Sequence, residues 1–161
     1  MAASGQSLPH FTPWYAAEMF AASEFAKRGY VISWPTVPTK YDLIVDNGTK
    51  LFKIQVKQGY IRPQRRKPAG KGDLPAYRIG LWRKNRNDFE HKPFKVTEFD
   101  YLAAVCDGNI YVIPVSLISS AEVPGCTVRM ILIKPPSETT RADSLAAIKK
   151  WEACRNNFVL T

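Results

Sequence analysis

The spacing of hydrophobic and polar residues predicts a helix near the start of the chain, a series of short strands, and a second helix near the end. The first helix is expected over 13–28, because Thr12-Pro13 and Gly29 are in the order of N-cap, first-turn proline and C′ glycine. The second is expected from Ser137 to about Arg155. The predicted strands are 30–34, 41–46, 50–57, 77–82, 101–106, 110–115 and 127–133. This order predicts an α/β (α+β) fold with a central mixed β-sheet flanked by helices.

Turn signals join two pairs of these strands into hairpins. Asp107-Gly108-Asn109 separates 101–106 from 110–115, and Asn47-Gly48 separates 41–46 from the strand that follows. A two-residue loop at Asn47-Gly48 places Asp46 opposite Thr49 and Asp42 opposite Lys53.

Alternation along the first hairpin assigns its side chains to two faces. Leu43, Val45, Phe52, Ile54 and Val56 form the expected core face. Asp42 and Gln55 lie on the other face as diagonal neighbours, about 7–8 Å apart, and Lys57 lies one step further along. The side-chain oxygen atoms of Asp42 and Gln55 can bind one shared metal ion, with the Lys57 ammonium beside it.

The first helix adds an acidic residue to this region. Glu18 lies on the stripe Trp14, Glu18, Ala21 and Phe25, which is expected to face the core. A carboxylate there is protonated, paired with a cation or bound to a metal, because an isolated buried charge is unfavourable. A structural ion pair with Lys53 or Lys57 is one reading. For Lys53 itself, a pair with Asp42 is expected.

Positive charge is concentrated in one part of the chain. The formal net charge is +9, yet Lys50 to Lys95 carries +11 and the remainder −2. Such a cluster indicates a polyanionic partner. A solvated basic surface and an anionic membrane are alternatives, but nucleic acid is favoured because the sequence shows no amphipathic helix that could lie on lipid. The candidate contacts are Arg62, Arg65, Arg66, Lys67, Lys71, Arg83, Lys84 and Arg86. Tyr60, Tyr77 and Trp82 lie among them and either stack on nucleic acid or pack internally; for Trp82 we predict the core.

Composition excludes several other classes of protein. The chain has 161 residues, enough for one domain, which is expected over 1–161. Its three cysteines form no C-x-x-C pair, which excludes a structural zinc cluster and a disulfide framework. No signal peptide or membrane span is found, so a cytoplasmic protein is expected, without a membrane partner. His10 and His91 lie far apart, which disfavours a histidine-metal nuclease.

Lys40-Tyr41-Asp42 together with Gln55-Val56-Lys57, on a hairpin that follows a helix bearing Glu18, resembles the motif of the PD-(D/E)xK nuclease superfamily. The hairpin sequence is similar to the branch of intron-encoded homing endonucleases and Holliday-junction-resolvase-like enzymes. Phe99 to Val105 and Ile110 to Pro114 also resemble that branch, so the likeness covers most of 13–118. It implies a restriction-endonuclease-like core, with an additional strand and helix at about 127–155.

The resemblance implies a Mg²⁺-dependent endodeoxyribonuclease, with Mn²⁺ as a substitute. Glu18, Asp42 and Gln55 would be the metal ligands, and Lys57 would orient the attacking water. Two positions depart from the motif: no proline directly precedes Asp42, and Gln55 replaces an acidic residue. The neutral Gln55 leaves open a catalytically inactive nucleic-acid-binding protein on the same fold.

The resemblance also implies a substrate and an assembly. The DNA would be double-stranded or branched, cut by a homing or restriction-like enzyme or by a junction-resolving one, in a bacterial or phage-infected cell. One site cuts one strand, so a homodimer or homotetramer is expected.

Overall fold

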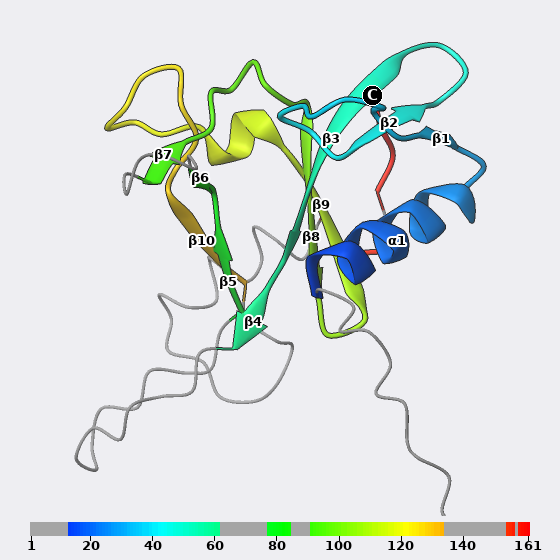
Figure 1. The fold of residues 1–161 in the computed structure, drawn as a ribbon, viewed down its shortest axis with the longest axis horizontal. Coiled ribbons are helices and arrows are strands. Elements are labelled where there is room, and N and C mark those ends of the chain that lie inside the picture. Colours follow the sequence, from blue (N-terminus) through cyan, green and yellow to red (C-terminus); the bar gives the residue numbers. More distant parts are fainter. Residues whose placement is uncertain (1–12, 62–76, 85–90, 134–153, 157) are drawn as a thin grey trace, which may run out of the picture.

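The computed structural model describes residues 13–61, 77–84, 91–133, 154–156 and 158–161 (Figure 1). These residues form a helix, a five-stranded sheet and two smaller sheets. The elements are α1 (Pro13–Ala26), β1 (Val31–Ser33), β2 (Leu43–Asp46), β3 (Leu51–Gln58), β4 (Tyr60–Ile61), β5 (Tyr77–Gly80), β6 (Trp82–Lys84), β7 (His91–Pro93), β8 (Tyr101–Cys106), β9 (Asn109–Pro114), the 3₁₀ helix η1 (Val115–Ile118) and β10 (Met130–Ile133). Every predicted strand has an observed counterpart, although the segment predicted over 77–82 is divided between β5 and β6.

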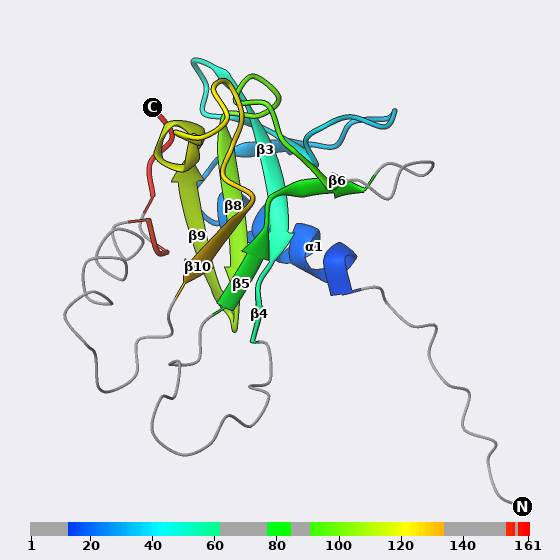
Figure 2. The same cartoon turned by 90° about the vertical axis from the view of Figure 1, so that its left-hand side faces the viewer.

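The central sheet is mixed, as predicted, and has the strand order β1-β2-β3-β8-β9. Its neighbouring strands are antiparallel except for β3 and β8, which run parallel with Ile54 opposite Tyr101. Parallel neighbours need a long connection, and the chain between β3 and β8 contains β4 to β7. Helix α1 covers one face of the sheet, and the sheet β10-β5-β4 lies on the other side (Figures 1 and 2).

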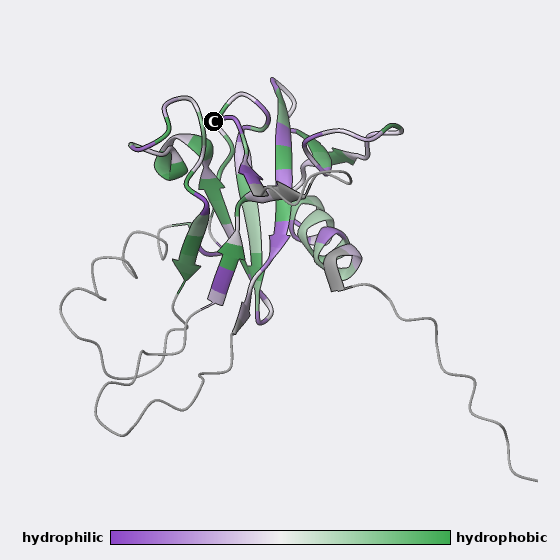
Figure 3. Cartoon of the chain, turned by 60° about the vertical axis from the view of Figure 1, so that its left-hand side comes forward, coloured by the Kyte–Doolittle hydropathy of each residue, from purple (hydrophilic) through white to green (hydrophobic). Residues whose placement is uncertain are grey.

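Two hydrophobic clusters occupy the two faces of the central sheet. Phe25 of α1 packs in the first cluster with side chains that include Val45 and Ile54. The second cluster joins Leu102 of β8 to Ile79 of β5 and to neighbouring apolar residues. Figure 3 shows hydrophobic residues along the central strands and hydrophilic bands on β3. The expected core face of the first hairpin is confirmed, because all five of its predicted side chains are buried.

Helix α1 ends two residues before the predicted boundary, in a Schellman motif. Gly29 has φ +84° and donates its N–H to Ala26 O, while the Tyr30 N–H reaches Phe25 O. The Tyr30 ring meets the Phe25 ring edge to face, with centroids 6.1 Å apart. This turn directs the chain into β1. Thr12, the predicted N-cap, lies outside the described residues.

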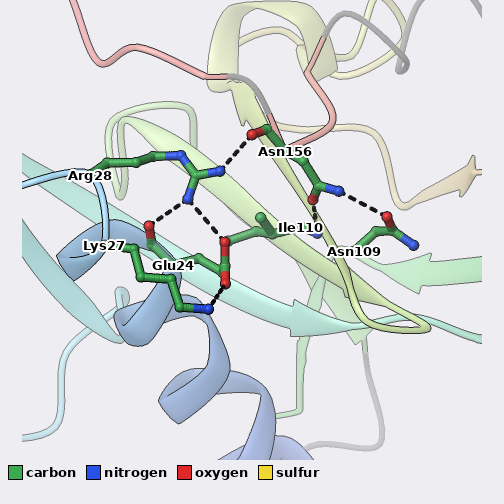
Figure 4. A network of polar contacts seen from close by, with 6 residues as sticks. All are labelled: Glu24, Lys27, Arg28, Asn109, Ile110 and Asn156. Carbon is green, nitrogen blue, oxygen red and sulfur yellow. Dashed lines mark hydrogen bonds and ion pairs between the residues drawn. The ribbon is translucent and has the colours of Figure 1, made fainter.

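A polar network attaches the end of α1 to the sheet and to the C-terminal segment (Figure 4). The Glu24 carboxylate pairs with Lys27 at 2.6 Å and with Arg28 at 2.9 Å. Arg28 also donates to the Asn156 carbonyl, and the Asn156 side-chain oxygen accepts the N–H of Ile110 on β9. These contacts fix the orientation of α1 and therefore the side from which its residues approach β3.

The second predicted helix falls mostly outside the described residues, at 134–153. Arg155, near its expected end, is not helical, because it forms a β-bridge with Tyr111 of β9. Its neighbours pair with the edge strand: the Cys154 carbonyl accepts the Val112 N–H at 3.0 Å, and the Asn156 N–H donates to the Ile110 carbonyl at 2.8 Å. In the described part of the chain, no helix is long and apolar enough to span a membrane.

Candidate active site

The first hairpin positions the predicted site, and its register differs from the expected one by two residues. Asp46 pairs with Leu51, not Thr49, so the loop has four residues, 47–50. Of the two turn residues, Gly48 has positive φ, at +86°, whereas Asn47 is outside that region. Asn47 instead accepts hydrogen bonds through Oδ1 from the Thr49 and Lys50 N–H groups, at 3.0 and 2.9 Å. This side-chain cap stabilises the wider loop.

The shift leaves the faces unchanged, because it is an even number of residues, but it improves the alignment of the site. Lys53 now pairs with Ile44, which places Asp42 opposite Gln55 rather than diagonal to it. The Gln55 side chain is 4% exposed and donates its Nε2 to Asp42 Oδ2 and, at 3.1 Å, to the Val56 carbonyl. The Val56 N–H also donates to Asp42 Oδ2, at 2.7 Å. The Asp42 carboxylate is thus held by two donors from β3.

Lys57 follows Gln55 on the same face of β3. Its register partner is Ala104 of β8, whose small side chain adds little bulk beside it. The Lys57 ammonium lies over the ring of Phe94, 5.4 Å from the centroid, in a cation–π contact. Phe94 is buried and packs edge to face against Phe99. The aromatic ring therefore supports the cation from the side of the second hydrophobic cluster.

Glu18 reaches this region from α1, at the border of the stripe that packs on the sheet. Ala17, Ala21 and Phe25 are buried, whereas Glu18 is half-buried. Its carboxylate interacts electrostatically with both Asp42 and Lys57. The proposed ion pair of Glu18 with a lysine is not formed within 4.0 Å among the described residues. The Trp14 side chain lies outside the description.

The three charged groups shift one another's proton affinities. Burial raises the pKa of Glu18, the Asp42 carboxylate raises it further, and the Lys57 ammonium opposes both effects. Burial also raises the pKa of Asp42, against the Val56 N–H, Lys57 and the Gln55 amide. Burial lowers the pKa of Lys57, although Asp42 and Glu18 stabilise its charge. Such opposed shifts within one cluster are typical of functional sites.

Other predicted residues lie elsewhere or outside the description. The expected pair of Lys53 with Asp42 is wrong, because the Lys53 ammonium donates to the Thr97 carbonyl at 3.0 Å. Trp82 is half-buried and absent from both hydrophobic clusters, so its placement in the core is also wrong. Arg83 and Lys84 lie on β6, with side chains outside the description. The remaining basic candidates Arg62, Arg65, Arg66, Lys67, Lys71 and Arg86 fall outside the described residues.

Two contributors to the site were not predicted from the sequence. Phe94 follows a proline in a short basic segment, where hydrophobic spacing gives no sign that it contacts Lys57. The Val56 N–H belongs to the backbone, so only the strand register reveals its bond to Asp42. Residue type and spacing identified the titratable side chains, while their supporting contacts come from the fold.

The donor chemistry of the site fits a divalent metal ion of the hard class. Asp42 and Glu18 supply carboxylates, and Gln55 supplies an amide oxygen, which are the ligands that Mg²⁺ accepts. The Asp42 charge raises the pKa of Glu18, a repulsion that a cation between them would relieve. Among the described residues, no three His, Cys, Asp or Glu side chains gather into a metal-binding group. Any site here therefore depends on the amide oxygen or on a ligand from the substrate.

One protein-family model matches most of the length of the chain. The family model of the PD-(D/E)XK endonuclease matches residues 15–153. The chain belongs to the PD-(D/E)XK endonuclease family. Family membership supports a nuclease and DNA as its substrate, and the match includes all four site positions. No curated protein sequence matches the chain significantly.

Two solved structures are similar to this PD-(D/E)XK family member, and the first of them supports its fold. The bacterial homing endonuclease I-Ssp6803I is 20% identical, with a TM-score of 0.62 over 87% of this chain and 88% of that one. MepB is 13% identical, with a TM-score of 0.43 over 86% of this chain and 93% of that one. The likeness to I-Ssp6803I confirms the restriction-endonuclease-like core.

Proposed function

We propose that the chain is a metal-dependent endodeoxyribonuclease that hydrolyses phosphodiester bonds in double-stranded or branched DNA. The observation that supports this most directly is the meeting of Asp42, Gln55 and Lys57 on one face of the β2–β3 hairpin, with Glu18 from α1 beside them. Family membership gives the reaction class. The fold shared with the homing endonuclease I-Ssp6803I supports the same reaction class.

Asp42, Gln55 and Glu18 would hold Mg²⁺, or Mn²⁺ as a substitute. When bound, the ion supplies Lewis-acid activation of water and neutralisation of charge on the scissile phosphate. Gln55 would contribute Oε1, because its Nε2 is engaged by Asp42 and by the Val56 carbonyl. This ligand set has one negative charge fewer than a set of three carboxylates, which favours weaker metal binding and a requirement for a DNA phosphate as a further ligand.

Lys57 has the central chemical role in this proposal. Its ammonium orients the attacking water and stabilises the negative charge that develops on the phosphoryl oxygens. Asp42 and Glu18 favour the charged form of the ammonium and so oppose the lowering of its pKa by burial. Such a preorganised charge typically contributes on the order of 10²–10³ in rate.

Plasmid nicking with Mg²⁺ tests the proposal, using Asp42→Asn and Lys57→Ala beside two matched controls. Asp46→Asn changes a carboxylate on the same face of β2 that accepts the Gly48 N–H. Lys53→Ala changes a lysine on the same face of β3. We expect both site variants to lose about 10² or more in rate. The controls should retain cleavage, and EDTA should abolish it.

The neutral Gln55 supports a second candidate, a nucleic-acid-binding protein without catalytic activity. This alternative predicts that the wild-type chain binds DNA but leaves plasmid intact with Mg²⁺ and Mn²⁺. Calorimetric titration of both metals into the DNA complex separates the candidates independently of cleavage. No heat of binding in wild type, together with intact plasmid, would sink the enzyme proposal.

A further inference from the structure

The outer face of the small sheet carries an aromatic groove that the proposed catalytic chemistry does not use. The groove is lined by Tyr60, Arg78, Gly80, Trp82 and Met130. Tyr60 is 57% exposed and Met130 is 43% exposed, both unusually open for large side chains on strands. Tyr77 and Ile79 alternate with the groove residues along β5 and are buried against the central sheet. The groove therefore lies on the side of β5 that faces away from the core.

Strand pairing explains how the aromatic side chains come together. Tyr60 of β4 pairs with Arg78 of β5, and Met130 of β10 pairs with Gly80. The Trp82 ring lies on Gly80, where an added Cβ would be 2.6 Å from the ring. Tyr60 and Gly80 are diagonal neighbours on this face, about 7–8 Å apart. The missing side chain at Gly80 thus leaves room for the indole over this strand, in the same groove as Tyr60.

The chemistry of the lining suits a nucleobase. Aromatic faces stack on bases of any sequence, and a guanidinium adds a charge that attracts the phosphate backbone. Among the described residues, no acidic side chain lines the groove. In the sequence, the segment 62–76 that joins β4 to β5 has five basic residues and one acidic residue. An apolar protein partner would not require this charge. The lining thus favours a base attached to a polyanionic chain.

The groove is close along the chain to β3, the strand that carries the proposed catalytic Lys57. Tyr60 follows Lys57 by three residues, through Gly59, whose N–H donates to the Val105 carbonyl at 2.8 Å. An added Cβ at Gly59 would be 2.5 Å from the Cys106 sulfur, so the chain passes close to β8 at this point. The strand that presents Lys57 is therefore continuous with the strand that presents Tyr60.

We propose that this groove binds an unpaired DNA base by stacking on the exposed ring of Tyr60, with Trp82 in the wall of the groove, and so selects substrates with unpaired nucleotides. The proposal rests on the proposed nuclease function and specifies its substrate class. Bases in an intact duplex hide their faces within the stack, so only a branch, bubble, end or extruded base can enter. Arg78 holds the adjacent backbone through its charge.

Anisotropy titration in EDTA tests this without cleavage, using a labelled duplex with a central bubble and the fully paired duplex of the same length. We expect the wild-type chain to bind the bubble more tightly. Tyr60→Ala should weaken bubble binding about tenfold, within the range of stacking contributions, and change duplex binding less than twofold. Tyr60→Phe should retain the preference.

Two substitutions, Gly80→Ala and Trp82→Ala, test the role of the indole, so the result does not depend on the folding of either variant. Gly80→Ala displaces the indole and should reduce the bubble preference, even if Trp82→Ala fails to fold. Leu132→Ala is the matched control, because Leu132 is 45% exposed and pairs with Arg78, yet does not line the groove. It should leave the preference intact.

Several results would overturn the base-binding proposal. These are an equal loss on both DNAs, no loss for Tyr60→Ala, or dissociation of a wild-type oligomer into monomers by Tyr60→Ala in analytical ultracentrifugation. The last result would assign the face to a second copy of the chain. The anisotropy assay measures binding and does not depend on cleavage. A protein that prefers the bubble in this assay but leaves plasmid intact in the nicking assay would therefore refute only the proposed nuclease function.

Discussion

Lys57 experiences two opposing influences in the folded protein. Burial lowers its pKa, while Asp42 and Glu18 raise it, and the first effect is larger. A lowered pKa means that the folded state binds this proton less tightly than the unfolded state does. The charged lysine therefore destabilises the fold fully below the folded pKa, and the penalty disappears as the pH rises to the unfolded pKa. Sites that keep such charges commonly trade stability for function.

Lys57→Met should therefore stabilise the protein while it abolishes cleavage. The expected gain is about 1 kcal/mol at neutral pH, which is typical of a single stabilising substitution. Urea unfolding followed by circular dichroism measures it, and the gain should shrink at strongly alkaline pH. Lys53→Met is the control, because the Lys53 ammonium is hydrogen-bonded to Thr97 and should not yield a gain. A destabilised Lys57→Met protein would contradict the argument.

The pH–rate profile of cleavage should have an acid limb and an alkaline limb, which lie closer together than for an ordinary aspartate and an ordinary lysine. The acid limb reports protonation of Asp42, whose raised pKa moves this limb to higher pH than for an ordinary aspartate. The alkaline limb reports loss of the Lys57 proton, whose lowered pKa moves it to lower pH than for an ordinary lysine. Single-turnover rates across the pH range measure both limbs.

The Glu18→Gln variant tests whether the alkaline limb of the pH–rate profile reports Lys57. It removes a charge that stabilises the Lys57 ammonium, so the alkaline limb of the residual activity should move to lower pH. Glu24→Gln on the same helix is the matched control, because Glu24 pairs with Lys27 and Arg28 instead. An alkaline limb unaffected by Glu18→Gln would remove Lys57 as its origin.

Phe94 is expected to act as a positioning residue for Lys57. Its ring lies 5.4 Å from the ammonium, a contact that contributes about 1 kcal/mol or more when partly desolvated. Phe94→Leu should lower kcat several-fold, leave KM unchanged and move the alkaline limb to lower pH. Phe94→Tyr keeps the aromatic face and should restore both kcat and the limb. Loss of stability without a shifted limb would reduce Phe94 to a packing role.

At the scale of elements, the loop 47–50 determines how Asp42 meets Gln55. Asn47 caps the loop through Oδ1, and its Nδ2 donates to the Leu160 carbonyl at 3.1 Å. Asn47→Ala removes these bonds and should destabilise the protein by about 1–2 kcal/mol, as loss of a side-chain cap does. Chemical denaturation measures this change. Thr36→Ala, in an exposed loop, should change stability by less than about 0.5 kcal/mol.

The same loop explains how far the sequence determines the site. Asn-Gly favours a two-residue turn at 47–48, yet here the Asn47 N–H donates to the Lys50 carbonyl at 3.3 Å and the Asn47 side-chain oxygen accepts the Thr49 and Lys50 N–H groups. The paired strands are therefore separated by four residues. Asp107 and Gly108 do form a two-residue turn, with φ +48° and +71°. Faces follow from alternation and survive an even shift, so the side chains near Asp42 were predictable. The pairing partner depends on register, which local sequence left open.

Contacts between distant segments were the least predictable part. The strands β4 and β7 have two and three residues, too short to show a periodic pattern. Trp82 was assigned to the core from residue type, but the absence of a side chain at Gly80 gives it a place on the outer face. A tryptophan side chain can pack either in the core or on the outer face of a sheet, so the tertiary packing around Trp82 determines its position.

At the scale of the whole molecule, the charge distribution should dominate DNA affinity. Residues Lys50 to Lys95 carry +11, whereas the rest of the chain carries −2. If this region makes about 6–10 phosphate contacts, affinity should fall roughly 10³–10⁵-fold between 50 and 200 mM salt. Filter binding over that range, in EDTA, measures the slope. A nearly salt-independent affinity would contradict a phosphate-binding surface.

The number of chains in the active assembly determines how many strands are cut. The described residues of each chain form one candidate site. We therefore expect a double-strand break to need two chains, in a homodimer or within a homotetramer. Mixed assemblies of wild-type and Asp42→Asn chains, purified by two different tags, test this on supercoiled plasmid. They should accumulate nicked circles, whereas assemblies with Asp46→Asn chains should yield linear DNA like wild type. Linear product at the wild-type proportion from the Asp42→Asn mixture would show that one chain cuts both strands.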